Sequence, residues 1–222
     1  MPYASPSPML RVVQTSGSKK GIVRSGLGVK GWLARPPSVD DVRPAACIQC
    51  ETPSRRPGRG FALWGHGCRG RLVEGPLGPD EQPAWVEVTA RRYLCIVCGA
   101  VMEVVPRGVL AGCRYLAGAI ALALALYGKL GAKVAEVRRR TSTTATSAGF
   151  GEACRWSTLR RWVATAMAGR LFGAARLTRA VSGWSPRRCA AHVASTLAAY
   201  APPSARHLPP EAQAYLGGVQ VS

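Results

Sequence analysis

Two Cys-x-x-Cys pairs constrain this 222-residue chain more than any other feature of its sequence. Each pair places two sulfurs about one turn apart, close enough to share one metal ion. Four thiolates together satisfy the tetrahedral preference of zinc. We therefore predict a structural Zn²⁺ site whose ligands are Cys47, Cys50, Cys95 and Cys98.

The two knuckles differ, and the other cysteines leave alternatives open. Gly99 follows the second pair and suits a tight knuckle, whereas Glu51 stands at the matching place after the first pair. A redox pair would open a helix after a strand, and neither pair does. His66 or Cys68, in the same segment, could replace one ligand. Three further cysteines lie in helical or near-helical context and are expected as small core residues: Cys113, Cys154 and Cys189.

The charge of the chain is strongly unbalanced. It carries 30 Lys plus Arg against 11 Asp plus Glu, for a formal net charge of +19. Such a chain repels itself unless a polyanion is its partner, which favours nucleic acid. A basic ribosomal-type protein and GC-rich codon usage, which raises Arg, Ala and Gly together, are the alternative interpretations.

The apolar segments predict no membrane partner. The most apolar run, between Arg114 and Lys129, is shorter than the ~20 residues that a span requires, and it indicates a buried core helix. The N-terminus lacks the apolar block of a secretory signal. We expect a cytoplasmic, nucleoid-associated protein, in which paired cysteines bind metal or perform redox chemistry.

The order of patterns along the chain predicts an α+β fold. Residues 1–43 are rich in Ser, Pro, Gly and basic side chains, and read as a disordered basic arm or, in part, as a misassigned start. Residues 44–106 read as a β zinc ribbon. The candidate strands there are Phe61–Trp64, Arg71–Glu74, Trp85–Leu94 and Met102–Val105.

Residues 109–201 have helical periodicity and predict a helix-turn-helix-like domain, followed by a loose tail over 202–222. The expected helices cover 116–127 and 133–140. A third starts at an N-cap, Ser157, and a fourth starts at Ser185 with Pro186 in its first position. The stripe Cys189, Val193, Leu197 and Tyr200 marks the buried face of the fourth helix.

The third helix has the features of a DNA recognition helix. Leu159, Trp162, Val163 and Ala166 share one apolar face, and the arginines near its start would suit phosphate or base edges. A solvated basic face is the alternative, and the segment of about 141–156 is longer than a standard turn. The predicted DNA contacts are Lys133, Arg138, Arg139, Arg140, Arg155, Thr158, Arg160, Arg161 and Thr165.

Several motifs in one order resemble the N-terminal region of bacterial insertion-sequence transposases, and the short zinc-ribbon plus helix-turn-helix proteins related to them. They are Cys47-x-x-Cys50, Trp64-Gly-His-Gly-Cys-Arg-Gly-Arg71, Arg91-Arg-Tyr-Leu-Cys-Ile-Val-Cys-Gly99, Val105-Pro-Arg and Arg114-Tyr. The resemblance covers residues 44–165. It implies zinc binding by the four paired cysteines and double-stranded DNA contact by the helix from Ser157. A protein partner from a mobile element is a further hypothesis.

Catalysis is not expected. Strand transfer requires metal ions held by three carboxylates, and no Asp follows Asp80. Two other binding functions stay open: a protein-interaction module that docks a polymerase or recombinase, and an RNA-binding module. In the RNA-binding module Trp64, Trp85 and Tyr93 would stack on bases. The sequence sets neither the DNA site nor the oligomeric state.

Overall fold

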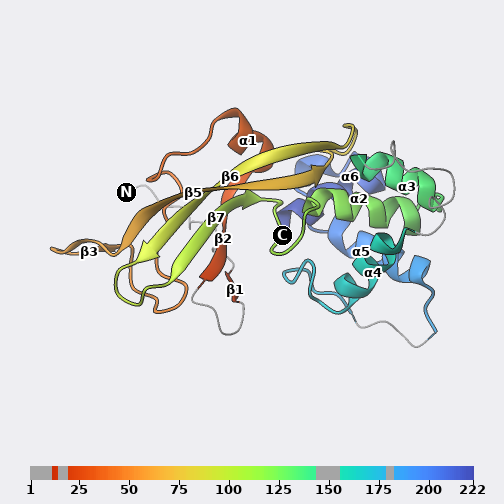
Figure 1. Ribbon diagram of the computed structural model, residues 1–222. Helices are drawn as coiled ribbons and strands as arrows, with labels where there is room; N and C mark the ends of the chain where they lie inside the picture. The colour runs from red at the N-terminus through yellow and green to blue at the C-terminus, as the bar shows by residue number, and fades with distance from the viewer. Residues whose placement is uncertain (1–11, 15–19, 144–155, 179–182) are drawn as a thin grey trace. The chain divides into compact units, whose positions relative to one another are not determined.

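The computed structural model describes residues 12–14, 20–143, 156–178 and 183–222 (Figure 1). Strands and helices are both present, so the α+β prediction is confirmed. The chain divides into two compact units: unit 1 comprises residues 1–71 and 87–107, and unit 2 comprises 72–86 and 108–222. The predicted domains differ from this division, because residues 72–86 were expected in the ribbon and belong to unit 2.

A five-stranded sheet has the order β1-β2-β7-β6-β5. β2 runs parallel to β7, and β6 is antiparallel to β7 with Tyr93 opposite Met102. Two strands predicted separately, at Phe61–Trp64 and Arg71–Glu74, are largely joined in β5. The strands are β1 (Val12–Gln14), β2 (Lys20–Gly28), β5 (Leu63–Gly75), β6 (Ala84–Cys95) and β7 (Val101–Arg107), with a small second sheet of β3 (Arg55–Arg56) and β4 (Gly60–Phe61).

The prediction of a disordered arm is wrong for residues 20–34. They form β2 and the short helix α1 (Val29–Ala34). Trp32 of α1 is 1% exposed, and its indole nitrogen donates to the carbonyl of Thr89 at 3.1 Å. Burial of Trp32 and Val23 stabilises this segment despite its Gly-rich composition. Residues 1–11 and 15–19 lie outside the described part of the chain.

Unit 2 is built around α2 (Ala117–Gly128), whose residues Ala117 to Leu126 are all buried. This confirms the core helix predicted from the apolar run. Four other helices contact α2, as Figure 1 shows. They are α3 (Val134–Thr141), α4 (Ser157–Met167), α5 (Pro186–Ala198) and α6 (Pro210–Gln220).

The start of α5 is the one predicted. The Ser185 hydroxyl accepts from the backbone N–H of Arg188 at 3.2 Å, and Pro186 is the first helical residue. Cys189, Val193 and Leu197 are buried.

The expected loose tail is wrong. After a short 3₁₀ turn, η2 (Pro203–Ala205), residues 210–220 form α6, which packs on α2 and α5. Its buried positions are mostly small, and small side chains let helices approach closely. Gly217 lies so near the Leu197 carbonyl that no Cβ fits between them. Tyr215, 5% exposed, adds a large buried ring to this contact.

Candidate metal centre and candidate nucleic-acid interface

Two loops of unit 1 bring the four predicted ligands together. Cys95 ends β6 and Cys98 lies in the turn before β7, while Cys47 and Cys50 come from a loop closed by the bridge between Ala46 and Pro53. The four sulfurs all lie within 4.8 Å of one another. The Sγ atoms of Cys47 and Cys98 are 3.6 Å apart, and those of Cys50 and Cys95 are 3.7 Å apart. The four cysteines therefore form a cluster that can hold a metal ion.

The cluster has the dimensions of a tetrathiolate site. In a tetrahedron with metal–sulfur bonds of about 2.3 Å, the sulfurs are separated by about 3.8 Å. The two cross-loop distances lie close to this value. Cys47 and Cys95 are 2% and 0% exposed, whereas Cys50 is open to solvent. The site is thus buried on one side, and an ion could enter from the Cys50 side.

The two cysteine loops share one backbone pattern. In the first, the Cys47 N–H donates to the Thr52 carbonyl at 2.9 Å, and the Glu51 N–H donates to the Cys47 carbonyl at 2.9 Å. In the second, Cys95 and Gly99 repeat the same two bonds, each at 2.8 Å. In addition, the Gln49 N–H points at the Cys47 sulfur at 3.4 Å. The repeated pattern fixes the spacing of the two sulfurs in each pair.

Three thiols of the cluster, those of Cys47, Cys50 and Cys98, have unlike acidities. Burial raises the pKa of Cys47 to about 12, and burial also raises the pKa of Cys98. The Thr52 hydroxyl, 3.1 Å from the Cys50 sulfur, lowers the pKa of Cys50 to about 6 together with the Thr52 backbone. One thiolate is therefore favoured without a cation. A bound cation would supply the positive charge that lets the Cys47 and Cys98 thiols ionise.

His66 and the other cysteines that the structure describes lie outside the cluster. Within the described residues, the four-cysteine group includes neither His66 nor Cys68. Cys68 is exposed, and its sulfur accepts from the Arg91 guanidinium at 3.0 Å. Cys189 is buried in the helical core, and Cys113 packs against that core, as expected of small core residues. Cys154 falls outside the described residues.

The predicted apolar face of α4 is confirmed. Leu159, Trp162, Val163 and Ala166 are all buried. The Trp162 ring meets Trp156 edge-on, with 5.0 Å between ring centroids. The predicted cap is wrong: Ser157 is the first helical residue, and Trp156 stands at the N-cap without a side-chain hydrogen bond.

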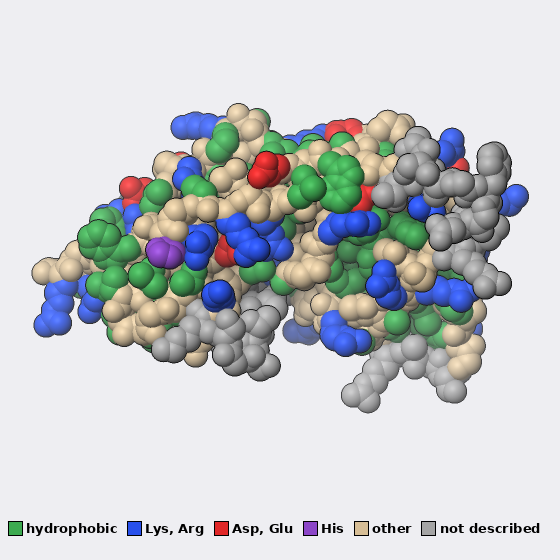
Figure 2. Space-filling view, viewed as in Figure 1, with side chains coloured by type: hydrophobic (Ala, Val, Ile, Leu, Met, Phe, Trp, Pro, Cys, Tyr) green, Lys and Arg blue, Asp and Glu red, His purple; other side chains and the backbone are tan. Residues whose placement is uncertain are grey.

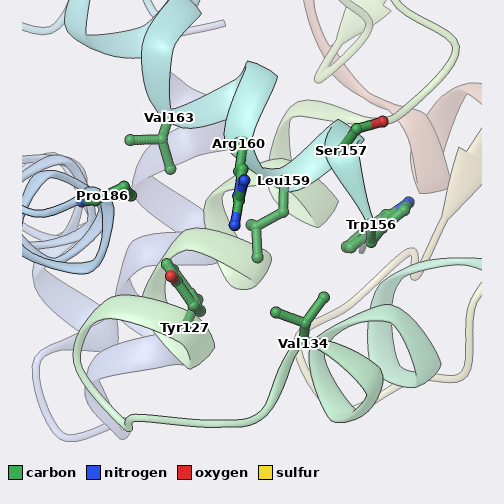
Figure 3. A pocket seen from close by; sticks show the side chains of 8 residues that line it. All are labelled: Tyr127, Val134, Trp156, Ser157, Leu159, Arg160, Val163 and Pro186. Atoms are coloured by element: carbon green, nitrogen blue, oxygen red, sulfur yellow. The ribbon is translucent and has the colours of Figure 1, made fainter. Parts of the chain in front are cut away.

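The solvent side of α4 carries the predicted polar contacts. Arg161 is exposed, and its guanidinium donates to the Thr158 hydroxyl at 3.3 Å. The Thr165 hydroxyl donates to the Arg161 carbonyl at 2.6 Å. Arg160 is also exposed, but its side chain points toward a cavity beside the helix (Figure 3). Arg161, flanked by two threonines, is thus the better placed of the two for an external partner.

The arginines of α3 are less available than predicted. Arg139 pairs with Glu136, and Arg140 donates to the Pro79 carbonyl at 3.4 Å. Arg138 is half-buried, whereas Arg139 and Lys133, which is the N-cap residue, are exposed as expected. A short and mostly polar helix favours outward arginines, yet two of the three lie partly against the rest of unit 2. Arg155 lies outside the described residues.

A buried carboxylate that sequence reasoning missed lies in unit 2. Glu74 is 0% exposed. Its Oε1 accepts from the Ser142 hydroxyl at 2.6 Å and from the Thr143 N–H at 2.9 Å, and its Oε2 lies 3.2 Å from Nε of Arg114. Ser142 was expected in a polar loop between two helices, and it is 1% exposed. A single Glu at the end of a strand pattern gives no signal of such a network, because its partners lie far along the chain.

Comparisons with protein-family models, curated proteins and solved structures found no match for this chain. None of the helices in the described ranges combines the length and apolar character that crossing a membrane requires. Figure 2 shows that Lys and Arg side chains recur over the visible face, while Asp and Glu are sparse.

Proposed function

We propose that this chain is a non-catalytic zinc protein that binds double-stranded DNA through α4. One observation carries the proposal: α4 buries its whole apolar face and leaves Arg161 exposed between the half-buried Thr158 and Thr165. The helix lies in a long stretch without acidic residues, from Ala153 to Pro210. That stretch contains Arg155, Arg160, Arg161, Arg170, Arg176, Arg179, Arg187, Arg188 and Arg206.

The side chains on this face suit a duplex. Arginine binds phosphate or the guanine edge in two-point geometry, and threonine hydroxyls bind phosphate oxygens. Ala164 and Ala168 are exposed and small, so a nucleic-acid backbone could approach the helix closely. Because Arg161 is held by Thr158, less side-chain entropy is lost when it binds.

Zinc is the metal we propose for the cluster. Four thiolates favour a soft ion in tetrahedral geometry, and zinc with four protein ligands keeps no open position for chemistry. Its role in this proposal is to hold the two cysteine loops together, so unit 1 would be a zinc ribbon extended by β2 and α1. Iron is the competing ion, and metal analysis distinguishes the two.

We further propose that the protein is related to mobile elements, as a transposase remnant, an accessory factor or a domesticated regulator located at the nucleoid. The motif order between Cys47 and Arg114 supports this relation. The scarcity of carboxylates supports a role without strand-transfer chemistry, since no Asp follows Asp80. The helix-turn-helix-like arrangement of α2, α3 and α4 remains part of this proposal.

A second candidate function, protein interaction, is favoured by an apolar tip on the second cysteine loop. Ile96 and Val97 are 55% and 51% exposed, and Trp64 is 57% exposed. The Ile96 N–H donates to the carbonyl of Ala62, two residues before Trp64, so these side chains belong to one region of unit 1. The RNA alternative is weaker, because Tyr93 is 0% exposed and cannot stack on a base.

The test measures metal content and nucleic-acid binding on one purified sample of the full chain. We expect about one zinc per chain by elemental analysis, and binding of a mixed-sequence duplex that is tighter than binding of the matching single strand. If the protein contains zinc but does not bind the duplex, the DNA proposal is overturned and the protein-interaction candidate is left. A purified protein that contains iron would overturn the choice of zinc.

A further inference from the structure

A cavity of about 630 Å³ lies within unit 2, and four helices contribute to its walls (Figure 3). Its size is in the range of small-molecule sites in proteins. The walls are mainly apolar, and the aromatic ring of Tyr127 from α2 forms one side. Val134 of α3, Leu159 and Val163 of α4, and Pro186 of α5 supply aliphatic surface.

One cation points into this apolar space. The side chain of Arg160 extends from α4 into the cavity toward Tyr127 (Figure 3). None of the described residues that line the cavity is acidic. Among the described residues, none forms a hydrogen bond or ion pair with Arg160. A guanidinium in such a position attracts an anion, because none of the described residues uses its charge or its donors.

A second guanidinium stands at the Tyr127 wall. The guanidinium carbon of Arg187 lies 4.5 Å from the centre of the Tyr127 ring, and its nitrogen donates to the Ala132 carbonyl at 3.4 Å. Arg187 is thus held in place by its stacking and its hydrogen bond. It adds positive potential at the wall that faces Arg160.

We propose that this cavity binds a small organic anion with a flat apolar body, of the class of aromatic carboxylates. The apolar walls would bury the body, and Arg160 would pair with the carboxylate through two N–H donors. The proposal is independent of DNA binding and of the metal. It gives Arg160 a role different from that of its neighbour Arg161, which stands outside the cavity.

The test uses two probes that differ only in charge, 1-pyrenebutyrate and 1-pyrenebutanol, with the zinc-loaded full chain in about 150 mM salt. Pyrene fluorescence reports transfer into an apolar site. We expect the carboxylate to bind at least tenfold more tightly than the alcohol. We expect Val134→Trp, which fills the cavity, to weaken binding of both probes.

Two matched variants locate the charge effect. Arg160→Met and Arg161→Met each remove one cation from α4, so their effects on net charge are identical. We expect the preference for the carboxylate to fall to about twofold or less in Arg160→Met and to persist in Arg161→Met. Equal losses in the two variants, equal binding of the two probes, or no binding of either would overturn the proposal. Circular dichroism of each variant must match the unmodified chain for the comparison to count.

Discussion

Glu51 and Gly99 occupy equivalent positions in the two cysteine loops, and both have left-handed backbones, with φ of 56° and 74°. Each N–H donates to the carbonyl of the first cysteine of its pair. Glycine adopts this conformation freely, whereas another residue is strained by roughly 1 kcal/mol. The first loop therefore holds strain that the second does not.

We predict that Glu51→Gly strengthens metal binding by up to about fivefold, and that Gly99→Ala weakens it by a similar factor. Competition with a fluorescent zinc chelator measures both changes. Glu51→Gln is the control, since it removes the carboxylate near the sulfurs but keeps a side chain at the left-handed position. If Glu51→Gln equals Glu51→Gly, charge and not backbone strain explains the gain.

Removal of the metal should affect the two units differently. The four clustered cysteines all lie in unit 1, and the binding energy of a structural zinc becomes folding energy. We expect a chelator, or Cys95→Ser, to abolish ordered structure in the cysteine loops and to weaken the sheet that Cys95 ends. The far-ultraviolet helical signal, which comes mainly from unit 2, should remain. Cys68→Ser is the control, and it should retain the metal. A chelator that changes neither signal would argue against a bound metal.

The DNA proposal predicts that substitutions in α4 weaken duplex binding to different degrees. We expect the double variant Arg160→Ala/Arg161→Ala to lose duplex affinity and to show a shallower dependence on salt. The slope of log K against log salt should decrease by up to about 0.9 for each phosphate that the variant no longer neutralises. Arg161→Ala alone should account for most of the change, because Arg160 points into the cavity. Fluorescence anisotropy across a salt series measures the slope. Unchanged binding in the double variant would contradict the assignment of α4.

The metal cluster could be predicted from the sequence because ligand chemistry is local. Each Cys-x-x-Cys loop holds its two sulfurs in place by bonds within six residues, such as that from Cys47 to Thr52. The stripes on α4 and α5 could be predicted for the same reason, since helical periodicity is a local pattern. What these elements contact depends on the rest of the chain, and the cavity at Arg160 exists only where four helices converge.

The elements that the sequence analysis did not predict depend on contacts between residues far apart in the chain, or on close packing of small residues. β2 pairs in parallel with β7, and Lys20 is opposite Val101, far along the chain. The Gly-rich sequence of β2 shows little alternation of apolar and polar residues. α6 is buried through small residues such as Ala214 and Gly218, which give no strong apolar stripe. Glu74 is buried because Arg114 and the end of α3 meet it, and neither is near it in sequence.

We predict that Glu74→Gln destabilises unit 2 by about 3 kcal/mol. The change removes one carboxylate oxygen, so Arg114 faces an amide N–H instead of an acceptor. Denaturant unfolding followed by helical circular dichroism measures the loss. Glu136→Gln is the matched control, because its pair with Arg139 is solvent-exposed and should contribute less than about 0.5 kcal/mol. Equal effects of the two substitutions would show that the Glu74 network does not stabilise the unit.

Tyr215 makes the stability of unit 2 depend on pH in the alkaline range. Its hydroxyl donates to the Pro76 carbonyl at 3.0 Å, and burial, with a smaller contribution from Glu81, raises the pKa of Tyr215 above that of an unfolded tyrosine. The folded state therefore retains the proton at pH values where the unfolded state releases it. The contribution of Tyr215 to the free energy of unfolding is complete below about pH 10. As the pH rises further, this contribution decreases by up to about 1.4 kcal/mol per pH unit.

We predict that Tyr215→Phe is less stable than the unmodified chain by about 1 kcal/mol near pH 8, where the hydrogen bond to Pro76 is intact. Between pH 10 and 12 the difference should shrink, because only the unmodified chain must keep a buried phenol protonated. Urea unfolding of both proteins at pH 8, 10 and 11 measures the difference, with return to pH 8 as the test of reversibility. A stability difference that is constant over this range would mean that Tyr215 ionises as readily in the folded state as in the unfolded one.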